Sequence, residues 1–158
     1  HLLDNKVCGI ARGRAEFGPR ALGNRSLLAD PRDLGIKDRV NEIKGREPFR
    51  PFAPVILEEY AKVYFDLPVK RSPYMQFTAK CNFPDKYPGI VHVDGTSRVQ
   101  TVTMRDNKPL YNLLRLWKGK TGCPMLLNTS LNVKGEPMVN DISDAKRFAT
   151  VNDVKVFS

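Results

Sequence analysis

Residues 44–54, which read Lys-Gly-Arg-Glu-Pro-Phe-Arg-Pro-Phe-Ala-Pro, constrain the fold more than any other stretch. Proline fixes its own φ and favours extended geometry in the residue before it, so three prolines predict a stiff loop. Lys44 and Arg46 are two residues apart, which predicts that their side chains project to the same side of an extended backbone. Together with Arg50 they suit a phosphate or carboxylate site. The alternative is an exposed turn whose charges are simply solvated.

The length of 158 residues predicts a single domain over residues 1–158. No apolar run approaches the ~20 residues that cross a bilayer, so we expect no membrane contact, and we find no signal-peptide pattern. Three widely spaced cysteines indicate reduced thiols in the cytoplasm and no local metal site. The chain opens with His1 rather than Met, from which we expect a piece of a longer protein.

The charge balance predicts a polyanionic partner. The net charge is +9, and eight of the thirteen arginines lie between Arg12 and Arg50. An excess of this kind suits nucleic acid or small phosphorylated ligands. The alternative is a positive face that only keeps the protein soluble.

Strand and helix patterns alternate along the chain. Apolar or β-branched runs predict strands at 6–11, 25–29, 54–57, 74–81, 98–103, 125–127 and 154–157. Helical spacing predicts helices from Asp33 to Ile43, over 58–65, over 109–118 ending at Gly119 or Gly122, and after Asp141, the last with Ile142, Ala145 and Phe148 facing inward. This interleaving predicts an α/β or α+β domain around a mixed sheet.

Four polar loops stand at the ends of these elements, at 14–25, 44–50, 92–98 and 128–132. They hold cations, amides and hydroxyls, without a Ser-His-Asp arrangement, a carboxylate pair or a phosphate-binding Walker A loop. Such a set favours electrostatic stabilisation of phosphoryl or acyl-phosphate oxygens. Two loops have simpler readings, because 128–132 could be a polar turn and Asp94-Gly95 a sharp bend. Asn128-Thr129-Ser130 also fits a glycosylation acceptor, against which the cytoplasmic character argues.

Four long motifs resemble the carboxy-terminal domain of the O-carbamoyltransferases, the family of nodulation-factor, cephamycin and tobramycin carbamoyltransferases. They occur in order over about residues 9 to 149, at 13–26, 44–54, 92–102 and 127–137. Leu131 departs from the phenylalanine usual in the family's Asn-Thr-Ser-Phe-Asn run, and we expect only a change in packing. The family's domain is similar in fold to the YrdC-like domain of threonylcarbamoyladenylate synthases, so the resemblance implies a twisted, open, mixed sheet with flanking helices.

The resemblance also implies an activity. Lys44-x-Arg46 and Ser130-x-Asn132 match the signature of the nucleotide pocket in that fold. The domain is then expected to bind carbamoyl phosphate and ATP, with Mg²⁺ held through the nucleotide phosphates. It would form carbamoyladenylate, and an amino-terminal actin-like domain of the same polypeptide would transfer the carbamoyl group to an acceptor hydroxyl. The sequence does not specify the acceptor.

We carry the roles over residue by residue. We expect phosphate to be bound by Arg20, Lys44, Arg50 and Arg98. We expect Ser130 and Asn132 to orient the ligand, and Asn128 to shape the loop behind them. Other roles stay open. Arg46 is expected either to bind phosphate or to form an ion pair with Glu47 or Glu136. Arg14 and Arg25 hold the glycine-rich loop or face the missing domain, and His92 and Asp94 are scaffold for Arg98 rather than a base.

Two other functions compete with this one. The net charge also fits a module that binds double-stranded RNA or another nucleic acid, as YrdC-like relatives do. Against it, the basic residues lie in loops without interleaved aromatic residues that could stack on bases. The third possibility is a non-catalytic piece that only docks on its partner domain.

Overall fold

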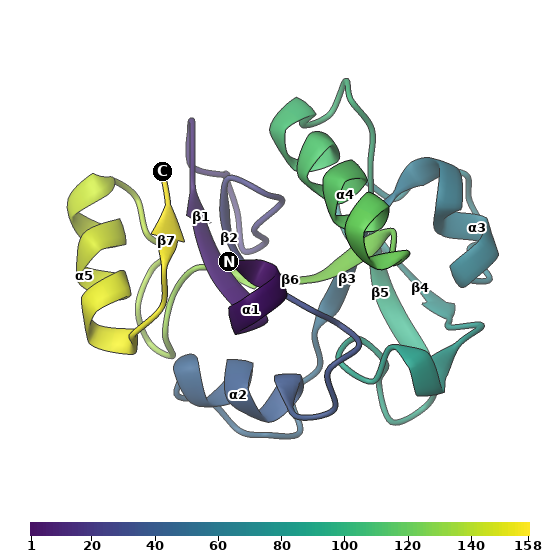
Figure 1. Cartoon of the computed structure of the whole chain (residues 1–158), viewed down its shortest axis with the longest axis horizontal. Coiled ribbons are helices and arrows are strands. Elements are labelled where there is room, and N and C mark those ends of the chain that lie inside the picture. Colours follow the sequence, from purple (N-terminus) through teal and green to yellow (C-terminus); the bar gives the residue numbers. More distant parts are fainter.

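The computed structural model describes residues 1–158 as a mixed sheet of seven strands with helices around it (Figure 1). The strands lie in the order β4-β5-β3-β6-β2-β1-β7. Strands β1 and β7 are parallel, as are β3 and β5, and the other neighbours are antiparallel. The sheet does not close, because β4 and β7 are its two edges. This confirms the predicted fold class.

The strands are β1 (Val7–Ala11), β2 (Arg25–Ala29), β3 (Ala53–Leu57), β4 (Phe77–Lys80), β5 (Thr96–Val102), β6 (Met125–Ser130) and β7 (Val156–Phe157). The helices are α1 (Leu2–Asn5), α2 (Ile36–Ile43), α3 (Ala61–Tyr64), α4 (Lys108–Thr121) and α5 (Ile142–Asn152), with short 3₁₀ turns at Glu58–Tyr60 and Pro84–Lys86. None of the helices combines the length and the apolar character that a bilayer crossing needs.

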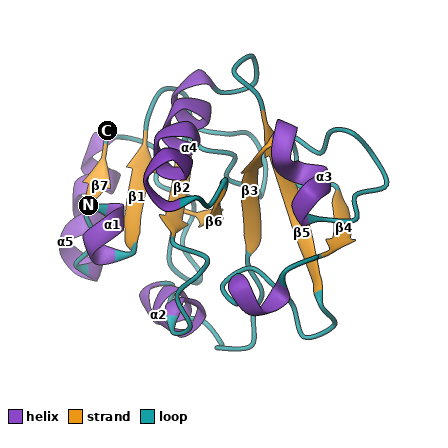
Figure 2. Cartoon of the chain, turned by 45° about the vertical axis from the view of Figure 1, so that its right-hand side comes forward, coloured by secondary structure: helices purple, strands orange, loops and turns teal.

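The helices pack around the sheet at different places. Helix α4 lies over β3 and β6, α5 lies along β7, and α2 lies below the strands in the view of Figure 1. Turning the molecule shows β3 and β5 side by side, with β2 and β6 between β3 and β1 (Figure 2). A single core of 34 buried residues joins these layers, and it is richest in leucine and valine from the central strands. The central strands are held by this core, so they can keep the side chains on the surface of the sheet in fixed positions.

The sequence patterns identified most elements, with two clear errors. Helix α4 presents Leu110, Leu114 and Trp117 to the core, and its last residue precedes Gly122 in a left-handed conformation. Asp141 caps α5 through hydrogen bonds from the backbone N–H groups of Ser143 and Asp144. The prediction that Ile142 faces inward is wrong, since its side chain is exposed. The prediction that Asp33 caps helix α2 is wrong, since the helix begins at Ile36 after Gly35. The Asp33 carboxylate instead accepts a hydrogen bond from the N–H of Gly35 before the helix starts.

Candidate functional site

Polar side chains gather on one face of the sheet, over β5, β3 and β6. The Asn128 side-chain amide donates a hydrogen bond of 2.7 Å to the Gln100 Oε1 atom, which places both side chains on the same face. Alternation along each strand puts Arg98 and Ser130 on that face as well. Ala53 of β3 lies directly opposite Asn128 and is small, so it leaves space between the two neighbouring strands. Strands β5 and β6 lie on either side of β3, so their backbones are separated by about 10 Å. The hydrogen bond between Asn128 and Gln100 therefore crosses over β3.

Lys44 reaches the end of this face from the carboxyl end of α2. Its ammonium group donates to the backbone oxygens of Ser130 and Asn132 at 2.5 and 2.8 Å. It also lies 3.0 Å from Asn132 Oδ1 and 3.3 Å from Ser130 Oγ. The side chain of Lys44 is buried, and no carboxylate forms an ion pair with it. The structure thus brings together three of the predicted site residues from segments about 87 positions apart.

The backbone around Lys44 differs from the prediction. Lys44 has helical angles, φ −82° and ψ −4°, and Gly45 follows with φ +57°. The predicted extended backbone is therefore wrong at Lys44 and Gly45. The helix end turns sharply at Gly45, which has no side chain to oppose a positive φ, and this turn directs Lys44 inward. The Asn128–Ser130 part of the predicted polar loop also differs, since it continues β6.

The environment of Lys44 disfavours its charge. Burial, together with the neighbouring positive charges of Arg46 and Arg50, lowers the pKa of Lys44 from 10.5 to about 7. A buried ammonium group without a counter-charge favours the binding of an anion, because an anion restores the charged form. Lys44 is therefore the group in this site whose protonation responds most strongly to a bound anion.

We expect anion binding to weaken as the pH rises through 7. Sulfate keeps its charge between pH 6 and 9, so a change in its affinity reports on the protein. Binding should be strongest below pH 7, where Lys44 is protonated, and should weaken up to about tenfold per pH unit above it. Isothermal titration calorimetry with sulfate measures this, and Lys44→Arg should flatten the profile. A flat profile for the unmodified chain would contradict the assignment.

Arg98 and Arg20 are two further cations without a carboxylate partner. Neither forms an ion pair, and the Nε atom of Arg98 is buried without any hydrogen-bond acceptor. Burial lowers the pKa of Arg98, and the positive charge of Arg20 acts in the same direction. Two positive charges that act on one another and have unused donors fit a site for an oxyanion. Arg20 is exposed and Arg98 is half-buried, so this part of the site is open to solvent.

The glycine-rich loop that carries Arg20 is fixed by long-range hydrogen bonds. Asn128 donates to the backbone oxygen of Ala21 at 3.0 Å, and Gln100 donates to that of Leu22 at 3.1 Å. The Glu16 carboxylate accepts hydrogen bonds from the backbone N–H groups of Leu22 and Asn24. Asn128 therefore holds the glycine-rich loop, while its expected role in shaping the loop behind Ser130 and Asn132 stays a prediction. Glu16 and Gln100 belong to the recognised motifs, but sequence reasoning gave them no role because contacts with the loop backbone leave no sequence pattern.

Arg25 also holds the glycine-rich loop in place. Its guanidinium group donates to the backbone oxygens of Arg12, Gly13, Asn24 and Asn140, all within 3.1 Å. This confirms that Arg25 holds the glycine-rich loop. Arg14 is exposed, and its backbone oxygen accepts a hydrogen bond from the Asn24 side chain.

Gly23 should not tolerate a side chain. Its φ is +120°, and an added Cβ would lie 2.5 Å from Leu110 Cδ2 and 2.9 Å from Asn107 Nδ2. We expect Gly23→Ala to lower the free energy of unfolding by about 2–4 kcal/mol, through steric overlap and backbone strain. Gly18→Ala is the matched control, because Gly18 also has a positive φ but no atom within 4 Å of the added Cβ. Urea denaturation measures both, and equal losses would contradict the steric argument.

Arg46 and Arg50 flank Lys44 with different surroundings. Arg46 donates to Asn41 Oδ1 at 2.7 Å and lies over the ring of Phe52. The proposed ion pair of Arg46 with Glu47 or Glu136 is wrong, because those carboxylates pair with Lys134 and Arg50, and with Arg147. The pKa of Arg46 is lowered to about 10 by burial and then by Arg50. Arg50 is exposed and lies 3.9 Å from Glu47, so most of its donors remain free.

The turn at 92–95 supports the neighbourhood of Arg98. Asp94 accepts hydrogen bonds from the backbone N–H and the hydroxyl of Thr96, and Gly95 has φ +78°. Burial lowers the pKa of His92, while Asp94 opposes this and the charges of Lys37 and Arg98 add to it. These contacts fit the expected scaffold role for His92 and Asp94, since neither group is set to move a proton.

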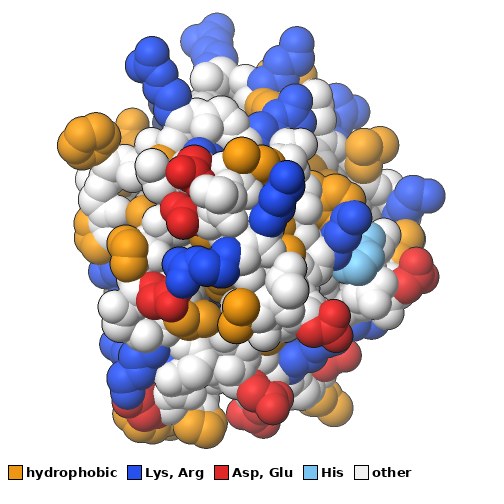
Figure 3. All heavy atoms as spheres, turned by 90° about the vertical axis from the view of Figure 1, so that its left-hand side faces the viewer, with side chains coloured by type: hydrophobic (Ala, Val, Ile, Leu, Met, Phe, Trp, Pro, Cys, Tyr) orange, Lys and Arg blue, Asp and Glu red, His pale blue; other side chains and the backbone are white.

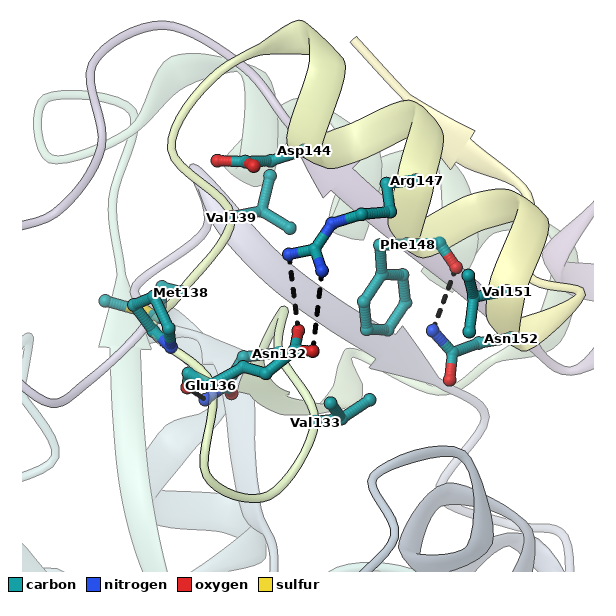
Figure 4. Close-up of a pocket in the computed structure, with 11 residues that line it drawn as sticks. Asn132, Val133, Glu136, Met138, Val139, Asp144, Arg147, Phe148, Val151 and Asn152 are labelled. Carbon is teal, nitrogen blue, oxygen red and sulfur yellow. Dashed lines mark hydrogen bonds and ion pairs between the residues drawn. The ribbon is translucent and has the colours of Figure 1, made fainter.

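A small cavity of about 70 Å³ lies behind Asn132, between the 132–139 loop and α5 (Figure 4). Asn132 donates to the backbone oxygen of Glu136, and Arg147 of α5 points across the cavity to the Glu136 carboxylate at 3.4 Å. Asn132 is thus held by its own loop on one side and by Lys44 on the other. No group of three or more His, Cys, Asp or Glu side chains is placed to hold a metal ion.

Comparison with known proteins gives consistent matches. The whole chain, residues 1–158, matches the family model described as "Carbamoyltransferase C-terminus". It is 46% identical to the nodulation protein NolNO of Sinorhizobium fredii over 149 residues, covering 91% of this chain and 22% of that protein. NolO of Bradyrhizobium diazoefficiens is also 46% identical, with 91% and 27% covered. Nodulation protein U of Rhizobium tropici is 40% identical, with 97% and 27% covered. The chain spans about a quarter of the length of these relatives.

Proposed function

The chain belongs to the carbamoyltransferase carboxy-terminal family, and from that premise we propose that it binds carbamoyl phosphate and ATP and forms carbamoyladenylate. One observation carries this proposal. Lys44, Arg98 and Arg20 border the same sheet face, and none of them has a carboxylate partner. Such a concentration of uncompensated charge suits a ligand with several phosphoryl oxygens.

The proposed reaction has two balanced steps. Carbamoyl phosphate and water give carbamate and inorganic phosphate. A carbamate oxygen then attacks the α-phosphorus of ATP, a new O–P bond forms, and the bond to pyrophosphate breaks. Arg20, Arg98 and Arg50 neutralise the charge on the phosphoryl oxygens, and Lys44 supplies a point charge beside Ser130 and Asn132. No side chain has to transfer a proton in the second step, which agrees with the scarcity of titrating bases in the site.

A magnesium ion in this site would be held mainly by the nucleotide and not by the protein. The side chains facing the site are cations, amides and hydroxyls, which are poor direct ligands for Mg²⁺ compared with carboxylates. A magnesium ion would enter with the nucleotide phosphates and balance their charge. We further propose that an actin-like segment elsewhere in the longer polypeptide transfers the carbamoyl group to an acceptor hydroxyl, in the cytoplasm.

Pyrophosphate release tests the proposal. The chain is incubated with ATP, Mg²⁺ and carbamoyl phosphate, and pyrophosphate is measured with a coupled assay, beside a reaction that lacks carbamoyl phosphate. We expect release only in the complete mixture, and mass spectrometry should detect carbamoyladenylate. The same assay with the intact relative NolO separates an inactive piece from a wrong function. If neither protein releases pyrophosphate, the proposal fails.

A nucleic-acid partner is the second candidate, favoured by the net charge of +9. On the face shown in Figure 3, however, Lys and Arg side chains are interspersed with Asp, Glu and hydrophobic groups, and they do not form one continuous stripe. Binding of double-stranded RNA that falls steeply with salt and ignores carbamoyl phosphate would favour this candidate.

A further inference from the structure

A second cavity is lined by Arg50, one of the cations that flank Lys44. Its volume is about 390 Å³, and it is formed by Lys37 of α2, residues 49–51 and residues 92–94. Arg50 belongs to both places, because it lines this cavity and its charge acts on Lys44. On the other side, the charge of Arg98 acts on His92 of the cavity wall. The cavity is therefore next to the cations that we assign to the phosphates, but it is distinct from them.

The walls of this cavity include apolar groups that nothing covers. The ring of Phe49 is 80% exposed, and the side chain of Val93 is fully exposed. These two residues are 44 positions apart in the sequence, and both line the same hollow together with Pro51. A large exposed apolar side chain at the mouth of a cavity marks a place where a ligand is covered. An exposed aromatic ring in particular suits stacking with a flat heterocycle.

The polar groups of the cavity suit the rest of a nucleoside. Arg50 has only a distant carboxylate, at 3.9 Å, and that carboxylate of Glu47 is already engaged by Lys134 at 2.5 Å. In Asp94, the Oδ1 atom accepts both hydrogen bonds from Thr96, which leaves Oδ2 without a partner. A free carboxylate oxygen can accept hydrogen bonds from sugar hydroxyls, and the free guanidinium can contact a phosphate.

We propose that this cavity binds the base and the ribose of a nucleoside phosphate, with the base against Phe49 and Val93 and the ribose hydroxyls near Asp94. Its phosphates would extend past Arg50 onto Arg98, Arg20 and Lys44. This proposal rests on the proposed function, because it assigns a position to the nucleoside part of the same substrate.

Calorimetric titration of two ligands separates the base from the phosphates. ATP carries both parts, whereas inorganic tripolyphosphate carries only the anionic part. Phe49→Ala should weaken ATP binding about tenfold, since stacking on one aromatic ring contributes a factor of this order. It should change tripolyphosphate binding less than twofold. Because Phe49 is exposed, its replacement leaves the core intact. Phe157→Ala is the matched control, since Phe157 lies on β7 at the opposite edge of the sheet, and it should change neither affinity.

Each result has a definite meaning. Unchanged ATP binding by Phe49→Ala would overturn the inference and leave the proposed function standing. Equal weakening of ATP and tripolyphosphate would also overturn it, because Phe49 would then shape the anion site instead of holding a base. If the unmodified chain binds neither ligand, the proposed function fails and takes this inference with it.

Discussion

Replacing Arg98 by alanine should lower the rate of carbamoyl-phosphate-dependent pyrophosphate release about 100- to 1,000-fold. The guanidinium group of Arg98 sits half-buried on the sheet face, with its Nε atom buried and unpaired. The protein therefore leaves these donors unused, and we propose that they contact the phosphoryl oxygens of the ligand. Loss of one preorganised donor to a developing negative charge commonly has an effect of this size. The rate is measured with saturating ATP and carbamoyl phosphate, and circular dichroism checks the fold.

Two comparison variants make the Arg98 prediction specific. Arg115→Ala removes an exposed arginine from α4, away from the site, and should leave the rate unchanged. Arg98→Lys keeps a positive charge but loses the planar fork, so it should recover only part of the rate. Because Arg98 has no protein partner, its loss should change the free energy of unfolding by less than about 0.5 kcal/mol. A normal rate for Arg98→Ala would remove Arg98 from the site.

The fold could be predicted from the sequence where a local pattern decides the structure. Leu110, Leu114 and Trp117 share one helical face, and Asp141 is placed to cap the helix that follows it, so α4 and α5 were identified. Ile142 was misplaced because it occupies the first turn of α5, where the helix has not yet packed on the sheet. The order of the strands, by contrast, depends on pairing between distant segments, which no local pattern specifies.

The candidate site, like the fold, could be predicted from the sequence only in part. The motifs with Lys44, Ser130 and Asn132 were identified as one site, and the structure brings these residues into contact. The extended backbone at Lys44 was predicted wrongly, because the turn depends on a left-handed Gly45 and not on the prolines that follow. The roles of Glu16 and Gln100 could not be predicted, since both act on the backbone of the glycine-rich loop, and Gln100 does so across 78 positions.

Lys44 offers the sharpest test of whether this site serves function at the expense of stability. Two effects oppose each other at this residue. The shift of its pKa from 10.5 to about 7 means that folding disfavours the ammonium by roughly 5 kcal/mol relative to the neutral amine. In the other direction, oxygens of Ser130 and Asn132 accept its hydrogen bonds, and each would lose about 1–3 kcal/mol if left buried without a donor.

Lys44→Met removes the ammonium group but keeps most of the side-chain volume, so both effects are lost together. Because they nearly cancel, we expect the free energy of unfolding, measured with urea, to change by less than about 2 kcal/mol. Pyrophosphate release should nevertheless fall at least about 100-fold, since the anion loses its buried charge partner. A loss of more than about 4 kcal/mol in stability would instead identify Lys44 as a structural clamp between α2 and β6. Such a clamp would hold the two elements together without serving the ligand, and the sulfate affinity would then not depend on its protonation.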